Sequence, residues 1–319
     1  MRVNPAGVME HVGIVMEDLA AARRLFHDKL ALPVADYPDS ADGPAFAVKV
    51  GGTVVRVASS QSVDARVGRP GISHVAFRIG SLAQARERLA ESGARVQSSV
   101  TMGSGGRKAV WSDPETTIGI PLQFVEEGVA LDFKPASKAP FIERVDHLGI
   151  AARSGDGARS VYVDGLGWPL ESTQTDSEFL IPIEITSNDR YGARSHSGTP
   201  IPRVGSGLIA LFVTVGDYDL EIMQPLGAAQ ISTPLGTIPG SVGQDQGAIA
   251  QALQKRGEGL LHIGFKVPDI RKAIERATQE GIEMIDPLPR PGSRNGFIAF
   301  MNRKSTERIL LHFTERNPL

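Results

Sequence analysis

The chain contains no cysteine and few aromatic residues. Its 319 residues include 2 tryptophans and 4 tyrosines, and aromatic residues make up 6% of the sequence. Without thiols the chain can form no disulfide, offer no cysteine nucleophile and build no thiolate metal site. Any metal that it binds must therefore be held by imidazole, carboxylate or amide groups.

The sequence also lacks a dominant charge and any long apolar run. The 34 lysines and arginines nearly balance the 36 aspartates and glutamates, and the formal net charge is -2. There is no basic block of the kind that follows nucleic-acid phosphates, and no apolar stretch approaches the ~20 residues that cross a bilayer. The segment MRVNPAGVMEHVGIV lacks the layout of a secretory signal. We therefore expect a cytoplasmic protein with no nucleic-acid or membrane partner, long enough for two domains.

A short histidine-containing pattern recurs along the chain. Its copies are EHVGIV at His11, SHVAFRI at His74, DHLGIA at His147 and LHIGFKV at His262. The chain has only 7 histidines. A single histidine in an apolar strand is usually a core residue, but four at the same place in a repeated strand indicate an internal repeat.

An amphipathic helix is expected after each copy. After His262, apolar residues fall at i, i+3, i+4 and i+7 from Ile270, with Asp269 as N-cap. The segments after the first two copies have the same layout, with Asp18 and Ser81 at the caps. The segment after the third copy, ARSGDGARSVYVDGLGWPL, is rich in glycine and more weakly helical.

Alternating strands follow each expected helix. AFAVKV and TVVRVA flank Gly51 and Gly52 as a hairpin, and GFIAFM and ERILLHFTE flank NRKST in the same manner. The repeated unit is thus a strand, a helix and about three strands. The four units lie at 8–60, 70–127, 143–225 and 259–316. We expect an N-terminal domain over 8–127, a linker over 128–142 and a C-terminal domain over 143–316, with inserted loops at 186–207 and 226–247.

This four-unit layout resembles the vicinal oxygen chelate superfamily, which includes glyoxalase I, methylmalonyl-CoA epimerase, extradiol ring-cleaving dioxygenases and bleomycin-binding proteins. The resemblance covers nearly the whole chain. It implies an α+β fold in which βαβββ units pair into two cup-shaped domains. It also implies that metal ligands come from the first and last strands of each unit. The reaction stays open, because one fold can host several chemistries.

The resemblance places the metal ligands in the C-terminal domain. The matching positions there are His147, Glu221, His262 and His312, which are all competent ligands. At the equivalent positions the N-terminal domain has His11 and His74, but Arg56 and Gln123 occupy the other two places. A guanidinium has no lone pair for a metal, so we interpret the N-terminal cup as structural.

Three histidines and one carboxylate would leave two adjacent positions on an octahedral ion, which suits a substrate with two neighbouring oxygens. The expected cofactor is one divalent ion: Fe2+, Mn2+, Co2+, Ni2+ or Zn2+. The leading interpretation is an isomerase or lyase that acts through an enolate. The alternatives are an Fe(II) dioxygenase that cleaves a catechol-like substrate, and a metal-free binding or resistance protein.

Each enzyme family matches only in part. The run KRGEGLLHIGFKVPDIRKAI, with the segment that follows it, is similar to methylmalonyl-CoA epimerases, whose last-strand ligand is a glutamate where this chain has His312. The metal ligands of extradiol dioxygenases are two histidines and a last-strand glutamate, and the family requires no ligand at the place of Glu221. If His312 does not bind the metal, it could act as an acid or base near neutral pH.

The inserted loops supply further candidates for substrate contact. Tyr191, Arg194 and His196 lie in the first insertion, and we expect Tyr191 and His196 to have catalytic roles. Four further residues could each accept a proton in the reaction, and the sequence does not distinguish among them: Glu184, Asp217, Tyr218 and Asp219. The partner is a small-molecule substrate. A homodimer is permitted but not required, because four units in one chain complete both cups.

Overall fold

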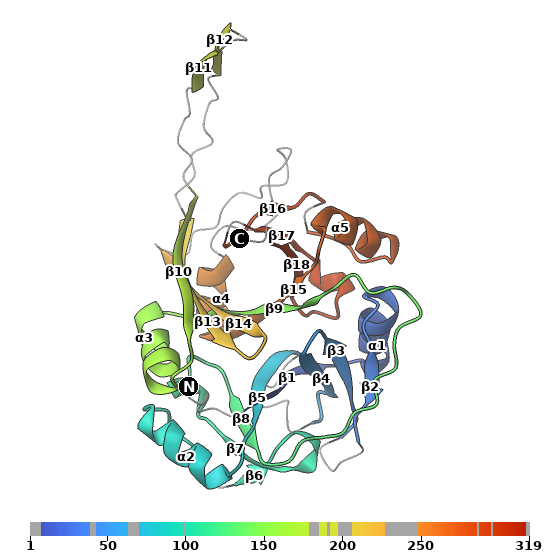
Figure 1. Ribbon diagram of the computed structural model, residues 1–319, viewed down its shortest axis with the longest axis vertical. Helices are drawn as coiled ribbons and strands as arrows, with labels where there is room; N and C mark the ends of the chain where they lie inside the picture. The colour runs from blue at the N-terminus through green and yellow to red at the C-terminus, as the bar shows by residue number, and fades with distance from the viewer. Residues whose placement is uncertain are drawn as a thin grey trace.

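The computed structural model describes residues 8–38, 43–62, 70–97, 100–178, 185–189, 192–196, 206–226, 248–285, 287–294 and 296–316. Within these residues the chain forms two curled sheets of eight strands each, with helices around their outer side (Figure 1). Each sheet is built from two successive units, so the predicted α+β fold of four βαβββ units is confirmed.

The N-terminal sheet has the strand order β2-β3-β4-β1-β5-β8-β7-β6. Its strands are β1 (Val8–Met16), β2 (Val34–Asp36), β3 (Ala45–Val50), β4 (Thr53–Ser59), β5 (Gly71–Arg78), β6 (Thr101–Met102), β7 (Lys108–Trp111) and β8 (Leu122–Val125).

The C-terminal sheet has the equivalent order β10-β13-β14-β9-β15-β18-β17-β16. Its strands are β9 (Arg144–Ala151), β10 (Leu170–Glu178), β13 (Ser206–Val215), β14 (Tyr218–Leu226), β15 (Gly259–Lys266), β16 (Arg290–Pro291), β17 (Phe297–Phe300) and β18 (Leu311–Glu315).

Three helix starts match the caps predicted from the sequence, among the five α-helices of the described residues. They are α1 (Leu19–Arg23), α2 (Leu82–Glu91), α3 (Gly155–Arg159), α4 (Ala248–Arg256) and α5 (Ile270–Gln279). The side chains of Asp18, Ser81 and Asp269 accept hydrogen bonds from backbone N–H groups in the first turns of α1, α2 and α5. The weakly predicted third helix is present as α3, which Ser154 caps and which continues as a π-helical segment over Ser160–Gly165. Helix α4 was not predicted from the sequence.

The first strands of paired units lie side by side and antiparallel, as β1 with β5 and β9 with β15. Each of these also pairs in parallel with the last strand of its own unit. In this register Arg56 lies opposite Gly13 as Glu221 lies opposite Gly149. The two sheets are therefore built on one plan, and equivalent positions can be compared directly.

Two segments differ from the expectation. The last hairpin was predicted to resume at Glu307, but β18 begins at Leu311, because Glu307 and Arg308 adopt positive φ angles of 50° and 68° that no strand accommodates. The first insertion holds a separate two-stranded ribbon, β11 (Ile185–Asp189) with β12 (Gly192–His196), where we expected only loops (Figure 1). The second insertion lies almost entirely outside the described residues. No helix among the described residues is long and apolar enough to span a membrane.

Candidate metal centre

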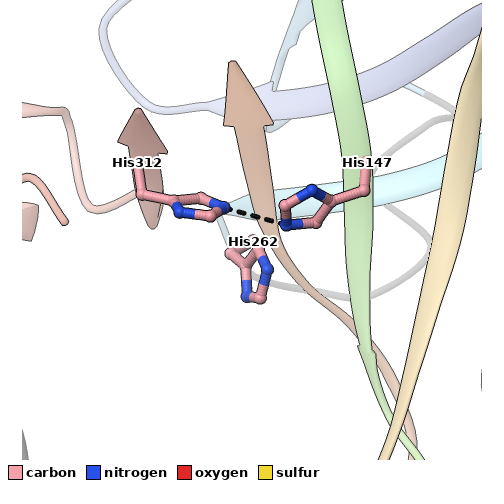
Figure 2. A group of neighbouring side chains, drawn as sticks. All are labelled: His147, His262 and His312. Carbon is pink, nitrogen blue, oxygen red and sulfur yellow. Dashed lines mark hydrogen bonds between the residues drawn. The ribbon is translucent and has the colours of Figure 1, made fainter. Parts of the chain in front are cut away.

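Three histidine side chains converge inside the C-terminal sheet (Figure 2). His147 comes from β9, His262 from β15 and His312 from β18, and all three are buried. One ring nitrogen from each lies within 4.8 Å of the others, and the Nε2 atoms of His147 and His312 are 2.9 Å apart. Among the described residues this is the one group of three His, Asp or Glu side chains placed to hold a metal ion.

Glu221 of β14 completes a set that we call the four-donor cluster: His147, Glu221, His262 and His312. Its Oε2 atom lies 3.3 Å from Nε2 of His147 and 3.3 Å from Nε2 of His262. The hydroxyl of Ser293 donates a hydrogen bond of 2.9 Å to the other carboxylate oxygen. The structure thus brings together all four residues that the resemblance selected.

Strand alternation and glycine explain this convergence. Leu220 and Ile222 are buried in the core on the face opposite Glu221. Gly149, in the repeated His-x-Gly pattern, lets the ring of His262 lie against the backbone. A Cβ atom at Gly149 would be 2.0 Å from Cε1 of His262, which no side chain can tolerate. The glycine of the repeat is therefore part of the site.

Electrostatics leave the cluster suited to a cation. Burial alone would raise the pKa of Glu221, but the imidazoles of His147 and His262 and the hydroxyl of Ser293 together lower it to about 2. Burial lowers the pKa of His262 against the opposing pull of Glu221. Burial and the charges of His147 and His262 hold the pKa of His312 well below 6.5. The cluster thus combines a carboxylate whose pKa is lowered with two imidazoles, His262 and His312, whose pKa values are also lowered, and these shifts favour the deprotonated forms that bind a divalent metal.

Within the four-donor cluster, a ring nitrogen of His262 is buried without a hydrogen bond. Nε2 of His262 is buried and makes no hydrogen bond within the described part of the chain, although Glu221 lies at ion-pair distance. A buried polar atom without a hydrogen bond is costly. A cation between the four donors would remove that cost, so the residues present fit a divalent metal.

Asp146 orients His147 from behind. Its Oδ1 atom lies 2.8 Å from Nδ1 of His147, so the ring directs Nε2 toward the other donors. Burial works to lower the pKa of His147, but Glu221 and Asp146 together raise it. The carboxylate of Asp146 is fully buried and also contacts Arg144, Arg294 and Arg316. Asp146 was not among the residues predicted from the sequence; its signal there is the acidic residue that directly precedes the histidine in the first and third copies of the repeat.

The structure gives three of the other candidates contacts of their own or buries them, and it leaves the rest undescribed. Asp219 is paired with Arg294 at 2.7 Å, and Asp217 accepts a 2.7 Å hydrogen bond from Thr53 of the N-terminal half. Tyr218 is buried, and burial raises the pKa of its hydroxyl. Four candidates have no described side chain: Tyr191 and Glu184 lie outside the described residues, and Arg194 and His196 lie in β12 with only their backbone described. Their proposed roles stay predictions.

The equivalent positions of the N-terminal sheet form a closed hydrogen-bonded network. The Nε2 atoms of His11 and His74 are 3.0 Å apart, and Oγ of Ser104 lies 3.2 Å from each. Gln123 donates a 3.0 Å hydrogen bond to the same hydroxyl. Arg56 lies fully buried, with its guanidinium carbon 4.6 Å from the centre of the Tyr37 ring. Ser104 thus lies within hydrogen-bonding distance of both histidines, and the structural role of this cup stays a prediction.

Comparison with known proteins assigns both halves to one family. Two models described as the glyoxalase/bleomycin resistance protein/dioxygenase superfamily match residues 8–124 and 146–300. The Bacillus subtilis protein YqjC is 24% identical over 174 residues, which is 54% of this chain and 93% of that protein.

Two named enzymes are also similar to the chain. The mitochondrial methylmalonyl-CoA epimerase of Dictyostelium discoideum is 25% identical over 118 residues, or 37% of this chain and 61% of the epimerase. A variant of 4-hydroxymandelate synthase from Streptomyces coelicolor has a solved structure that matches with a TM-score of 0.63 at 13% identity, over 98% of this chain and 93% of the synthase. At that identity the likeness concerns the fold.

Proposed function

We propose that this chain, which belongs to the glyoxalase/bleomycin resistance protein/dioxygenase superfamily, is a divalent-metal-dependent isomerase or lyase. Its substrate would be a small molecule with two neighbouring oxygens, bound at the four-donor cluster. The observation that carries the proposal is the position of Glu221, whose Oε2 lies 3.3 Å from both His147 and His262.

The fourth donor favours this reaction class over a dioxygenase. An octahedral ion has six positions, so four protein donors leave two, which two substrate oxygens fill. A dioxygenase with two histidines and one carboxylate keeps three positions open, enough for a bidentate substrate and dioxygen. Because Glu221 lies 3.3 Å from His147 and from His262, a fourth protein donor supports the smaller number of open positions.

The residues of the chain have distinct parts in this proposal. A divalent ion, when bound, supplies Lewis-acid polarisation that eases removal of a proton from the carbon beside a carbonyl. Asp146 holds His147 in the orientation that presents Nε2, and Ser293 restrains Glu221. The ring of Phe300 stacks on His312, with centroids 4.5 Å apart and planes inclined by 12°. These contacts preorganise the donors before a substrate arrives.

Elemental analysis of untagged protein tests the metal part. We expect about one equivalent of divalent metal in the wild type and in His11→Ala, and its loss in His262→Ala. His11 is the matched control because it occupies the equivalent place in the N-terminal cup. No metal in the wild type, even after reconstitution, would reject the proposal and favour a metal-free binding protein.

The reaction class needs a second measurement on the metal-loaded protein. We expect solvent deuterium to enter the carbon beside the carbonyl of a chelating substrate, detected by NMR across a panel of 2-oxo acids and acyl thioesters, without oxygen consumption. Iron together with substrate-dependent oxygen uptake would instead establish the dioxygenase alternative.

A further inference from the structure

A separate cavity of about 580 Å³ lies where the two halves of the chain meet. Its wall is formed by the starts of β5 and β15, the end of α4, and the loops that lead into β8 and β18. None of the four donors lines it. A volume in this range is typical of sites for small organic ligands.

Basic side chains dominate the charged part of the wall. Arg256, Arg303, Lys304 and Arg308 line the cavity, against the acidic side chains Glu258 and Glu307. Glu258 accepts a 2.7 Å hydrogen bond from the backbone N–H of Arg153, and Arg308 lies 3.5 Å from Glu17.

Arg303 is the most informative of the basic residues. Its side chain is half-buried, and burial together with the nearby charge of Arg256 lowers its pKa. No carboxylate among the described residues lies within ion-pair distance of it. Two guanidinium groups facing one cavity repel each other, and a bound anion would offset that repulsion.

The internal repeat shows that the fold itself does not require these charges. The loops before β8 and β18 have the same construction, a short 3-10 turn whose cap is Asp113 in one and Asn302 in the other. The first turn carries Glu115, which pairs with Arg95 at 2.8 Å, whereas the second carries Arg303 and Lys304. The loop before β18 is thus positively charged where the loop before β8 is negatively charged, although both have the same backbone turn.

Apart from Ser73, the rest of the wall consists of apolar residues and glycines. The apolar side chains include Ile72, Pro121, Leu260 and Leu310. The cavity is therefore amphipathic, with a basic region beside a hydrophobic one. A ligand that fits both regions has a strong anionic group on an apolar or aromatic body, and guanidinium groups match phosphate oxygens in geometry.

We infer that this cavity binds a small organic phosphate, with the phosphate against Arg256, Arg303 and Lys304 and the organic body against Ile72 and Leu260. The inference does not depend on the metal centre or on the proposed reaction.

Calorimetric titration at low salt tests the inference on the full chain. The probes are 1-naphthyl phosphate, AMP, adenosine and inorganic phosphate. We expect the two organic phosphates to bind with one site per chain, and adenosine and inorganic phosphate to bind at least about tenfold more weakly. The double substitution Arg303→Gln with Lys304→Gln should weaken the organic phosphates by at least about tenfold.

Arg95→Gln is the matched control, because it removes a positive charge from the equivalent loop region of the other half. It should leave the affinity unchanged, and the melting temperature and metal content of the double variant should equal those of the wild type. Absence of binding by both organic phosphates, equal affinity for inorganic phosphate, or unchanged binding by the double variant would each overturn the inference.

Discussion

At the scale of single residues, the proposed metal donors depend on side chains that would not themselves contact the metal. Asp146 is buried among Arg144, Arg294 and Arg316, and it still contacts Nδ1 of His147 at 2.8 Å. The three arginines offset the cost of burying its charge. The carboxylate is thereby kept ionised and fixed, which makes it a positioning residue for His147.

Asp146→Asn should therefore weaken metal binding without removing a donor. Loss of such a supporting carboxylate typically lowers metal affinity by about 10- to 100-fold. Competition with a chromogenic chelator would measure the change. Glu10→Gln, the equivalent substitution beside His11, should leave metal affinity at the wild-type value. If both variants bind metal as the wild type does, Asp146 has no positioning role.

The glycines of the repeat give a second residue-scale prediction. Gly149→Ala would place a Cβ atom 2.0 Å from Cε1 of His262, and Gly13→Ala would place one 2.1 Å from Cε1 of His74. Each should lower the free energy of unfolding by roughly 1–3 kcal/mol, because the ring must move. Only Gly149→Ala should also lose metal, as elemental analysis would show. Equal metal content in the two variants would contradict the arrangement of the four-donor cluster.

At the scale of elements, the two sheets have the same strand order but carry different groups at their centres. Strand β1 carries Glu10 and His11 as β9 carries Asp146 and His147. In the N-terminal sheet Glu10 contacts His11 and pairs with Arg107 at 2.8 Å, and Ser104 links the two histidines. Hydrogen bonds thus hold together the strands that a metal would hold together in the other sheet.

This arrangement makes the N-terminal sheet sensitive to acid. Burial lowers the pKa of His11 below 6.5, so the unfolded chain binds a proton there before the folded chain does, and stability is lost as the pH falls below 6.5. Burial alone would raise the pKa of Glu10, but His11 and Arg107 lower it far below 4.5. Its contribution is complete above pH 4.5 and is lost as the pH falls further.

Urea unfolding between pH 7 and pH 4 measures this loss. We expect the free energy of unfolding to decrease across the range. Glu10→Gln should lower it by about 3 kcal/mol at pH 7, because Arg107 loses a largely buried partner, and should flatten the dependence below pH 4.5. A wild type whose stability is constant across the range would contradict this account.

At the scale of the whole molecule, the two halves share one hydrophobic core. Trp168 of the third unit stacks on Tyr162 with planes 2° apart, and its ring centroid lies 5.4 Å from that of Phe77 in the N-terminal sheet. The hydroxyl of Tyr162 donates a 2.6 Å hydrogen bond to the backbone of Thr117. We propose 8–127 and 143–316 as the two domains, and these contacts join them.

Trp168→Ala should consequently destabilise both domains together. Removing a buried tryptophan costs about 3–5 kcal/mol. Circular dichroism and the fluorescence of the remaining Trp111, which lies in the N-terminal sheet, should report a single transition shifted by the same amount. Two separate transitions, with Trp111 unaffected, would show that the domains unfold independently.

The repeat in the sequence determined the four-unit fold and the caps of three helices, and the family resemblance selected the four residues that we propose as donors. Local periodicity specifies which face of a strand or helix is buried, and four histidines at one strand position specify where equivalent side chains meet. The unexpected start of β18 at Leu311 depended on two residues with positive φ, which neither charge nor hydropathy reveals.

Only the tertiary structure decided which groups surround the donors and the cavity. Asp146 meets Arg294 and Arg316, Ser293 meets Glu221, and Arg303 faces Arg256, each across long separations in the sequence. Such contacts depend on loop conformation and on how one sheet is placed against the other. No periodic pattern in the chain encodes either, so the support of the metal centre and the second cavity became visible only in the folded molecule.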